Sequence, residues 1–190
     1  MPLSHELDNL RKSLSCCTYH GDQHTHVLVE EHDKLAKLKK VTLKAPNGDW
    51  FSFNPDKGRG KAAFMSPLLA AGKKHDHHCA CDCVVLARND AGLQALYIDL
   101  KSGNPVGYSS QFKSTRQFVR YALGLLSEFY GYQFVLTEER YVVLYGGKPA
   151  LINKTLTVPR PTKIGKTQPD KPYKREVSNP CSLYLKELLS

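Results

Sequence analysis

The apolar residues of the chain follow helical spacing in three stretches. The first stripe consists of Leu3, Leu7, Leu10 and Leu14, and it predicts a short amphipathic helix that begins near Ser4. A longer stripe over residues 108–129 predicts a second helix, which Gly131 ends. Residues 181–189 regain helical spacing and predict a short C-terminal helix that docks the end of the chain.

Short apolar and β-branched runs elsewhere predict β-strands. The runs 81–87 and 93–100 flank the turn sequence Asn-Asp-Ala-Gly and predict a β-hairpin. The runs 41–44 and 50–53 flank Pro-Asn-Gly-Asp and predict another hairpin. Together the helices and strands predict an α/β fold, with a central mixed β-sheet flanked by helices.

The rest of the chain predicts shorter elements and one extended segment. Residues 132–136 and 141–145 predict two further strands around the polar sequence Thr-Glu-Glu-Arg. Short helical pieces are predicted at 34–40 and around 67–71. Residues 154–175 contain four prolines and seven basic residues against one acidic residue. This composition predicts an extended, poorly packed segment across the surface.

The composition is that of a basic globular chain. Its 190 residues suit a single domain over residues 1–190, because a second independent core would be cramped. The formal net charge of +9 favours a polyanionic partner, of which nucleic acid is the commonest. No stretch approaches the roughly 20 apolar residues of a membrane span. Charged residues occupy the N-terminal segment where a signal peptide needs an apolar core, so we expect a cytoplasmic protein with no membrane partner.

Two aspartates and a lysine occupy the ends of the hairpin predicted over 81–100. Asp82 starts its first strand and Asp99 ends the second, so a tight turn places the two carboxylates opposite each other. Two carboxylates that close repel unless a cation lies between them, and oxygen ligands at a small rigid site suit Mg²⁺ or Mn²⁺. Lys101 leaves the strand on the same face as Asp99. Its ammonium could there orient the attacking water and stabilise negative charge at a scissile phosphate.

The spacing of these three residues resembles the D…(D/E)xK pattern of the PD-(D/E)xK nuclease superfamily. The following helix carries Gln111 and Thr115, at the i, i+4 spacing of a Gln and a Tyr or Thr in that family. The resemblance implies a restriction-endonuclease-like core and a Mg-dependent endo- or exodeoxyribonuclease that hydrolyses phosphodiester bonds in DNA. It implies catalytic roles for Asp82, Asp99, Lys101 and Gln111, with the metal held by the two aspartates.

The resemblance also implies a further acid and further partners. The family usually has another acid on its first core helix, and the candidates in this sequence are Glu6, Glu30 and Glu31. Small nucleases of this type often act as homodimers or beside a partner ATPase or helicase, so such protein partners are expected. The charge pattern adds candidate contacts to the DNA backbone on the predicted helix, at Lys113, Arg116 and Arg120.

The same residues admit a second interpretation, because strand ends commonly meet solvent. Asp99 and Lys101 are then a surface pair and Asp82 is a turn cap. A nuclease fold whose site is catalytically incomplete would serve as a nucleic-acid-binding or complex-forming subunit. On this alternative the fold and the basic surface are the same, but the protein does not hydrolyse phosphodiester bonds.

A third interpretation comes from the histidines and cysteines. Residues 75–83 and 16–26 are both dense in potential zinc ligands, and they would suit a zinc-stabilised interaction protein. Cys79, Cys81 and Cys83, however, alternate as residues of one strand face do, whereas zinc sites use closely spaced pairs joined to a remote pair. With no secretory signal, this spacing favours reduced, buried thiols over zinc.

Overall fold

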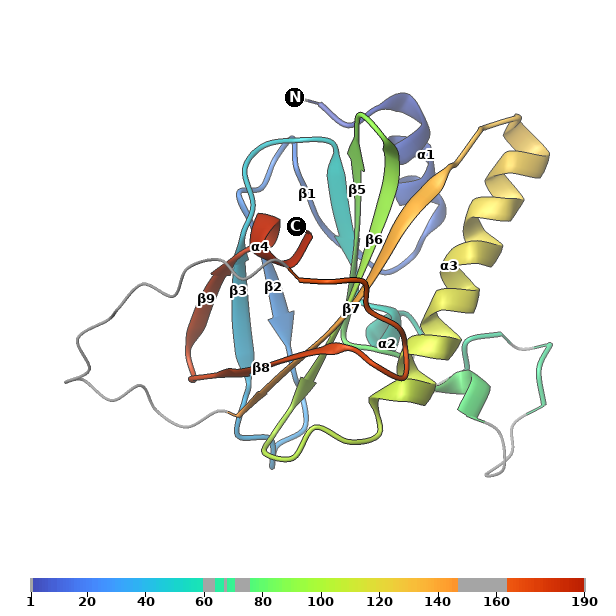
Figure 1. Cartoon of the computed structure of the whole chain (residues 1–190). Helices are drawn as coiled ribbons and strands as arrows, with labels where there is room; N and C mark the ends of the chain where they lie inside the picture. Colours follow the sequence, from blue (N-terminus) through green and yellow to red (C-terminus); the bar gives the residue numbers. More distant parts are fainter. Residues whose placement is uncertain (1, 60–63, 67, 71–75, 147–163, 190) are drawn as a thin grey trace.

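The structure is a computed structural model that describes residues 2–59, 64–66, 68–70, 76–146 and 164–189. Its main sheet has six strands in the order β1-β4-β5-β6-β7-β8 (Figure 1). These strands are β1 (Cys17–His20), β4 (Trp50–Phe53), β5 (Cys83–Asn89), β6 (Gly92–Lys101), β7 (Leu136–Gly146) and β8 (Tyr173–Val177). A second sheet has the order β2-β3-β9, formed by β2 (His26–Glu30), β3 (Lys40–Lys44) and β9 (Cys181–Tyr184).

The main sheet is mixed in strand direction. Neighbouring strands from β1 to β6 pair antiparallel, whereas β7 is parallel to β6 and β8 is parallel to β7. The parallel step from β6 to β7 is made through the helix α3 (Tyr108–Tyr130), which lies along the sheet in Figure 1. The predicted α/β class with a mixed sheet flanked by helices is confirmed at this coarse level.

Each face of the main sheet is buried by a different layer. The helices α1 (His5–Ser13) and α3 cover one face, where Leu7, Phe112 and Tyr97 belong to one apolar core. The small sheet and the helix α4 (Leu185–Leu189) cover the other face, where Val41 and Ile98 belong to a second core. Side chains along a strand alternate between the two faces. This alternation puts Asp99 and Lys101 on the same side as Tyr97, facing α3.

Several predicted elements are confirmed. The N-terminal helix begins at His5, with Ser4 at its N-cap position, and the long helix ends at Gly131 in a left-handed conformation. The hairpin predicted over 81–100 is the pair β5 and β6. Asn89 closes its turn, because its side-chain oxygen accepts the N–H groups of Ala91 and Gly92 at 2.9 and 3.1 Å.

The other predicted hairpin is wrong, because β3 and β4 belong to different sheets. All four residues of β4 are buried, and this strand pairs with β1 on one side and β5 on the other. The chain changes sheets at the turn before Trp50, whose ring nitrogen donates to the carbonyl of Pro46 at 2.8 Å. The histidine-rich region that contains β1 and β2 was not assigned from the pattern.

Three further predictions need correction. The polar sequence expected as a turn between strands at 132–136 and 141–145 instead belongs to one strand, β7, which begins at Leu136, and residues 132–135 form no strand. Glu138 accepts from Gln94 at 2.7 Å and Glu139 accepts from Tyr97 at 3.1 Å. The C-terminal stretch is a strand, β9, followed by α4. The expected helix at 34–40 is absent among these described residues, and β3 begins at Lys40.

The segment predicted as extended and poorly packed is described only from residue 164 onward. There Ile164 is buried, and Arg140 donates hydrogen bonds to the carbonyls of Ile164 and Gly165. The strand β8 then forms the edge of the main sheet. The described part is therefore extended and attached to the main sheet, and residues 154–163 lie outside the described chain.

The remaining short elements are a helical turn α2 (Pro55–Gly58) and a 3-10 turn η1 (Asp76–His78). Of the short helix expected around 67–71, residues 67 and 71 lie outside the described chain, and 68–70 are not helical. None of the helices in the described ranges combines the length and apolar character that crossing a bilayer requires.

Candidate active site

The β5–β6 hairpin brings Asp82 and Asp99 together. Cys83 pairs with Ile98 in the antiparallel register, so the next position in each direction sets Asp82 beside Asp99. The Leu100 N–H donates to Oδ2 of Asp82 at 2.6 Å, which ties the residue before β5 to the end of β6. The two carboxyl groups are close enough that the Asp99 charge raises the pKa of Asp82.

Lys101 joins this pair from the end of β6. Its Nζ lies 2.7 Å from Oδ2 of Asp99 and donates to Oε1 of Gln111 at 2.9 Å. Gln111 in turn donates to the Ala80 carbonyl at 3.1 Å. The Asp99 side chain is fully buried, whereas that of Lys101 keeps 21% exposure. Lys101 and the partly exposed Asp82 are therefore the members of this group that can reach a bound substrate.

The first turns of α3 brace the segment that leads to Asp82. The buried Thr115 accepts the Cys81 N–H at 3.0 Å through its hydroxyl oxygen. Ser114 donates to the His77 carbonyl at 2.5 Å, and Ser110 donates to the Asp76 carboxylate at 2.6 Å. Neither serine was predicted as a site residue from the sequence. The pattern that could have indicated them is the i, i+4 spacing of Ser110 and Ser114, beside Gln111 and Thr115 on the same helix.

Burial raises the pKa of both aspartates, so that each is a weaker acid than usual. Burial is the main reason that the pKa of Asp82 lies well above its ordinary value, and the nearby Asp99 carboxylate raises it further. Burial likewise raises the pKa of Asp99 to about 6, although the charge of Lys101 opposes this shift. Ionising both groups places two negative charges beside one ammonium. A cation of higher charge would stabilise that state.

The structure discriminates among the three candidates for a further acid. Glu31 lies near the pair, and its negative charge contributes to the raised pKa values of both Asp82 and Asp99. Glu6 instead pairs with Arg88 at 2.6 Å, at the opposite end of β5. Glu30 lies near Tyr19, whose pKa its charge helps to raise. Glu31 is thus the acid that the fold brings toward the site.

Oxygen donors from Asp82 and Asp99 suit a hard divalent cation such as Mg²⁺, which usually binds through one or two carboxylates and keeps several waters. No group of three His, Cys, Asp or Glu side chains within the described ranges is arranged to hold a metal ion. Glu31 is therefore not positioned as a third direct ligand. The carboxylate pair fits Mg²⁺ or Mn²⁺ on the number and type of its donors.

The three basic residues predicted on the helix differ in their surroundings. Lys113 is exposed, lies two residues from Gln111, and pairs with Asp170 at 2.6 Å. Arg120 pairs with Glu139 at 2.6 Å, farther along the helix. Arg116 lies against the phenol of Tyr141. Lys113 and Arg120 are thus engaged in ion pairs at the surface.

The cysteines and histidines make contacts of other kinds. Cys81 and Cys83 are buried, and burial raises the pKa of both thiols, which disfavours the thiolate that binds zinc. His77 contacts the Ala70 carbonyl at 3.0 Å, and His78 accepts the Met65 N–H at 3.2 Å. His75 lies outside the described residues. These contacts attach residues 64–66 and 68–70 to η1.

Comparisons with family models, with curated proteins and with solved structures found no match to this chain. The function of the chain must therefore be inferred from the geometry around Asp82, Asp99 and Lys101, and from the resemblance of their spacing to the PD-(D/E)xK pattern.

Proposed function

We propose that the protein is a metal-dependent nuclease that hydrolyses phosphodiester bonds in DNA, with a restriction-endonuclease-like core. The observation that carries the proposal is the adjacency of two carboxyl groups, the fully buried Asp99 and the half-buried Asp82, with the Lys101 ammonium 2.7 Å from Asp99. Burying two acids together is costly unless a cation compensates them. Such a costly arrangement is typical of a functional site.

Each residue has a role that follows from its position. Asp82 and Asp99 would hold Mg²⁺ or Mn²⁺, which when bound supplies charge neutralisation and lowers the pKa of a coordinated water. Lys101 is exposed enough to face the scissile phosphate, where its charge stabilises negative charge that grows as the P–O bond breaks. Gln111 holds the Lys101 side chain through its amide oxygen and so fixes the direction of the ammonium.

The surface around the site supports a polyanionic substrate. Lys113 is exposed on the first turns of α3, and Lys174 lies nearby with its Nζ 4.7 Å from the centre of the Tyr108 ring. Exposed lysines of this kind bind phosphates irrespective of base sequence. We still expect the protein to act as a homodimer or beside a partner ATPase or helicase. We also expect it to be located in the cytoplasm.

A second candidate function is a nucleic-acid-binding subunit with an incomplete site. It is favoured by the absence, among the described residues, of a third side chain arranged with the aspartates to hold a metal. On this alternative the Lys101–Asp99 pair only neutralises a buried charge. The two candidates differ in whether the protein turns over DNA.

Cleavage assays separate the two candidates. Purified protein should cut DNA with Mg²⁺ or Mn²⁺ and stop when a chelator is added. Asp82→Asn and Asp99→Asn should abolish cleavage while the protein stays folded, because each change removes one of two repelling charges. Glu6→Gln is the matched control, since Glu6 lies at the opposite end of β5 and should keep full activity. Cleavage that survives either aspartate substitution would rule out this active site.

A further inference from the structure

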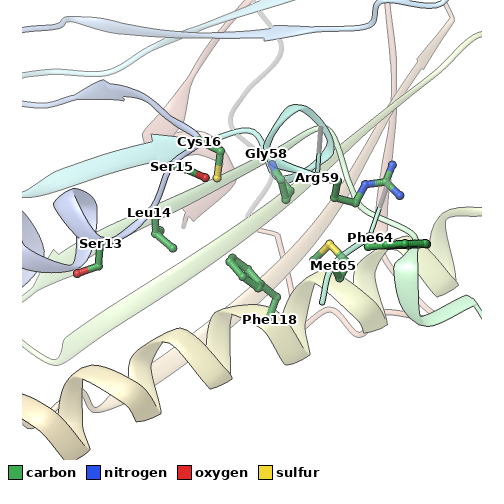
Figure 2. Close-up of a pocket in the computed structure, with 10 residues that line it drawn as sticks. Ser13, Leu14, Ser15, Cys16, Gly58, Arg59, Phe64, Met65 and Phe118 are labelled. Carbon is green, nitrogen blue, oxygen red and sulfur yellow. The ribbon is translucent and has the colours of Figure 1, made fainter. Parts of the chain in front are cut away.

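A cleft with a cavity volume of about 290 Å³ lies on the α3 side of the main sheet, outside the candidate active site. Figure 2 shows it between the end of α1, the turn α2 and the middle of α3. Two aromatic rings, Phe118 from α3 and Phe64 from the segment before η1, face this space together with Met65 and Leu14. Arg59 lies at one end, and the backbone there also carries Ser15.

The walls of the cleft are fixed by packing. Gly58 approaches Cys16 so closely that a Cβ at this position would lie 2.7 Å from the Cβ of Cys16. The Phe118 ring packs edge-on against the buried Phe53 at a centroid distance of 6.3 Å. The guanidinium of Arg59 is held by the Asp56 carboxylate and the His78 carbonyl. The cleft is therefore largely preformed, as ligand sites usually are.

The same helix connects this cleft with the candidate active site. Phe118 follows Gln111 by seven residues, so both lie on one face of α3 at a separation of about 10 Å along the axis. A few nucleotides of a DNA strand can span that distance. Arg59, at one end of the cleft, also donates to the carbonyl of His78, which lies four residues before Asp82. The cleft and the candidate active site are therefore connected through the chain before Asp82 as well.

We propose that this cleft binds one unpaired nucleobase of the DNA strand whose phosphodiester bond is cut at Asp82 and Asp99. The inference rests on the proposed nuclease function and adds a substrate class: DNA with unpaired nucleotides next to the scissile bond. The volume lies at the lower end of the range for small-molecule sites, which suits a single ring system.

The chemistry of the lining matches the two surfaces of a base. Every base has a π-face that stacks on an aromatic side chain, and the rings of Phe118 and Phe64 offer such faces. The Ser15 hydroxyl offers a hydrogen-bond partner for a base edge. Lys57 is exposed between the lining residues Pro55 and Gly58 and is available for a phosphate. A paired base would first have to leave its duplex, at a cost of a few kcal/mol. The cleft therefore favours single-stranded over blunt duplex DNA.

Leucine substitutions test the rings without removing their apolar bulk. The probes are a single-stranded oligodeoxynucleotide that contains the fluorescent base 2-aminopurine, and its blunt duplex, both measured in chelator so that no turnover occurs. Phe118→Leu and Phe64→Leu should each weaken single-strand binding on the order of tenfold, the scale of losing one stacking contact. They should also restore the 2-aminopurine fluorescence that stacking quenches. Phe129→Leu is the matched control, because Phe129 is 75% exposed at the far end of α3.

The outcomes separate the cleft from the active site. Unchanged affinity and fluorescence in both leucine variants, or equal binding of duplex and single strand by the wild type, would overturn the proposal for the cleft. Phe64→Leu decides alone if Phe118→Leu fails to fold, since the Phe64 ring is 38% exposed and lies in a surface segment. Ring-dependent binding without any metal-dependent cleavage would instead retain the cleft and reject the nuclease.

Discussion

At the scale of single residues, Lys101 links the strand β6 with the helix α3 at the candidate site. Its ammonium touches the Asp99 carboxylate from β6 and the Gln111 amide from α3. The amide on a second element fixes the ammonium in one direction, as a group that acts on a bound phosphate requires.

Lys101→Ala should therefore lower the single-turnover cleavage rate by a factor on the order of 10² or more, the scale of losing one preorganised charge-stabilising group. DNA affinity should fall only modestly, because other basic residues hold the backbone. Lys113→Ala is the control, since Lys113 is exposed and pairs with Asp170, and it should reduce affinity slightly with no effect on the rate. Rate and affinity that fall together in Lys101→Ala by the same small factor would make Lys101 one more phosphate contact.

The buried aspartates also make the stability of the metal-free protein depend on pH. The Asp99 carboxyl ionises near its ordinary pKa of 3.8 in the unfolded chain, whereas burial raises this pKa to about 6 in the folded protein. Between these values the folded state holds more protons, so the free energy of unfolding decreases as pH rises. Asp99 alone accounts for a loss on the order of 3 kcal/mol. Asp82, whose pKa is also raised, extends the decrease to higher pH.

Urea unfolding in chelator between pH 4.5 and 8 checks this expectation. Wild-type protein should lose stability across the range, and Asp99→Asn should lose less and be the more stable protein at pH 8. Asp90→Asn, which changes an exposed carboxyl in the hairpin turn, should follow the wild-type curve. A wild-type stability that increases from pH 5 to pH 8 would show that the pair is not held as the structure describes.

At the scale of elements, α3 braces the segment that leads to Asp82 and β5. Its first turns hold the segment 76–81 through Ser110, Ser114 and Thr115. The Cys81 N–H has Thr115 as its acceptor, and both residues are buried. The helix thus determines where the strand begins, and with it the position of the first carboxylate.

Thr115→Val removes this acceptor with little change in shape. It should destabilise the fold by about 1–3 kcal/mol, because a buried N–H loses its partner. Cleavage should also slow, since Asp82 directly follows Cys81. Thr115→Ser keeps the hydroxyl and should retain near wild-type activity. Thermal unfolding and cleavage rates on the two variants test the brace, and equal behaviour of valine and serine would contradict it.

The sequence predicted those elements whose partners are near in the chain. The apolar stripe of α3 and the Asn89 turn of the β5–β6 hairpin are local signals, and both appear in the structure. The small sheet is different, because β3 pairs with β9, which lies about 140 residues later. Such pairing leaves no local signal, so β3 was assigned to a hairpin with the strand that follows it.

The same distinction applies to the candidate site. Asp82, Asp99 and Lys101 belong to one hairpin, and their proximity follows from its register. The choice of Glu31 over Glu6 and Glu30 depends on how the small sheet lies against the main sheet, which the local sequence does not encode. The cleft beside Phe118 likewise combines four separate segments and has no sequence signature.

At the scale of the whole molecule, charge is distributed unevenly. The chain has a formal net charge of +9, yet three acids, Asp82, Asp99 and Glu31, gather at one end of the main sheet. A basic protein attracts a polyanion over its surface, whereas a local group of acids would repel that polyanion at close range. A divalent cation between the acids and the phosphate removes this conflict. The need for a metal is therefore the central claim.

Binding of Mn²⁺ to the metal-free protein tests this claim most directly. Mn²⁺ is titrated at pH 8 and the free ion is measured by its paramagnetic resonance signal. The wild type should bind the ion, and Asp82→Asn and Asp99→Asn should bind it far more weakly, because each removes a ligand. Glu6→Gln should bind like the wild type, since this residue pairs with Arg88 away from the site. A wild-type protein that leaves all Mn²⁺ free, or an Asp99→Asn variant that binds it unchanged, would contradict the account.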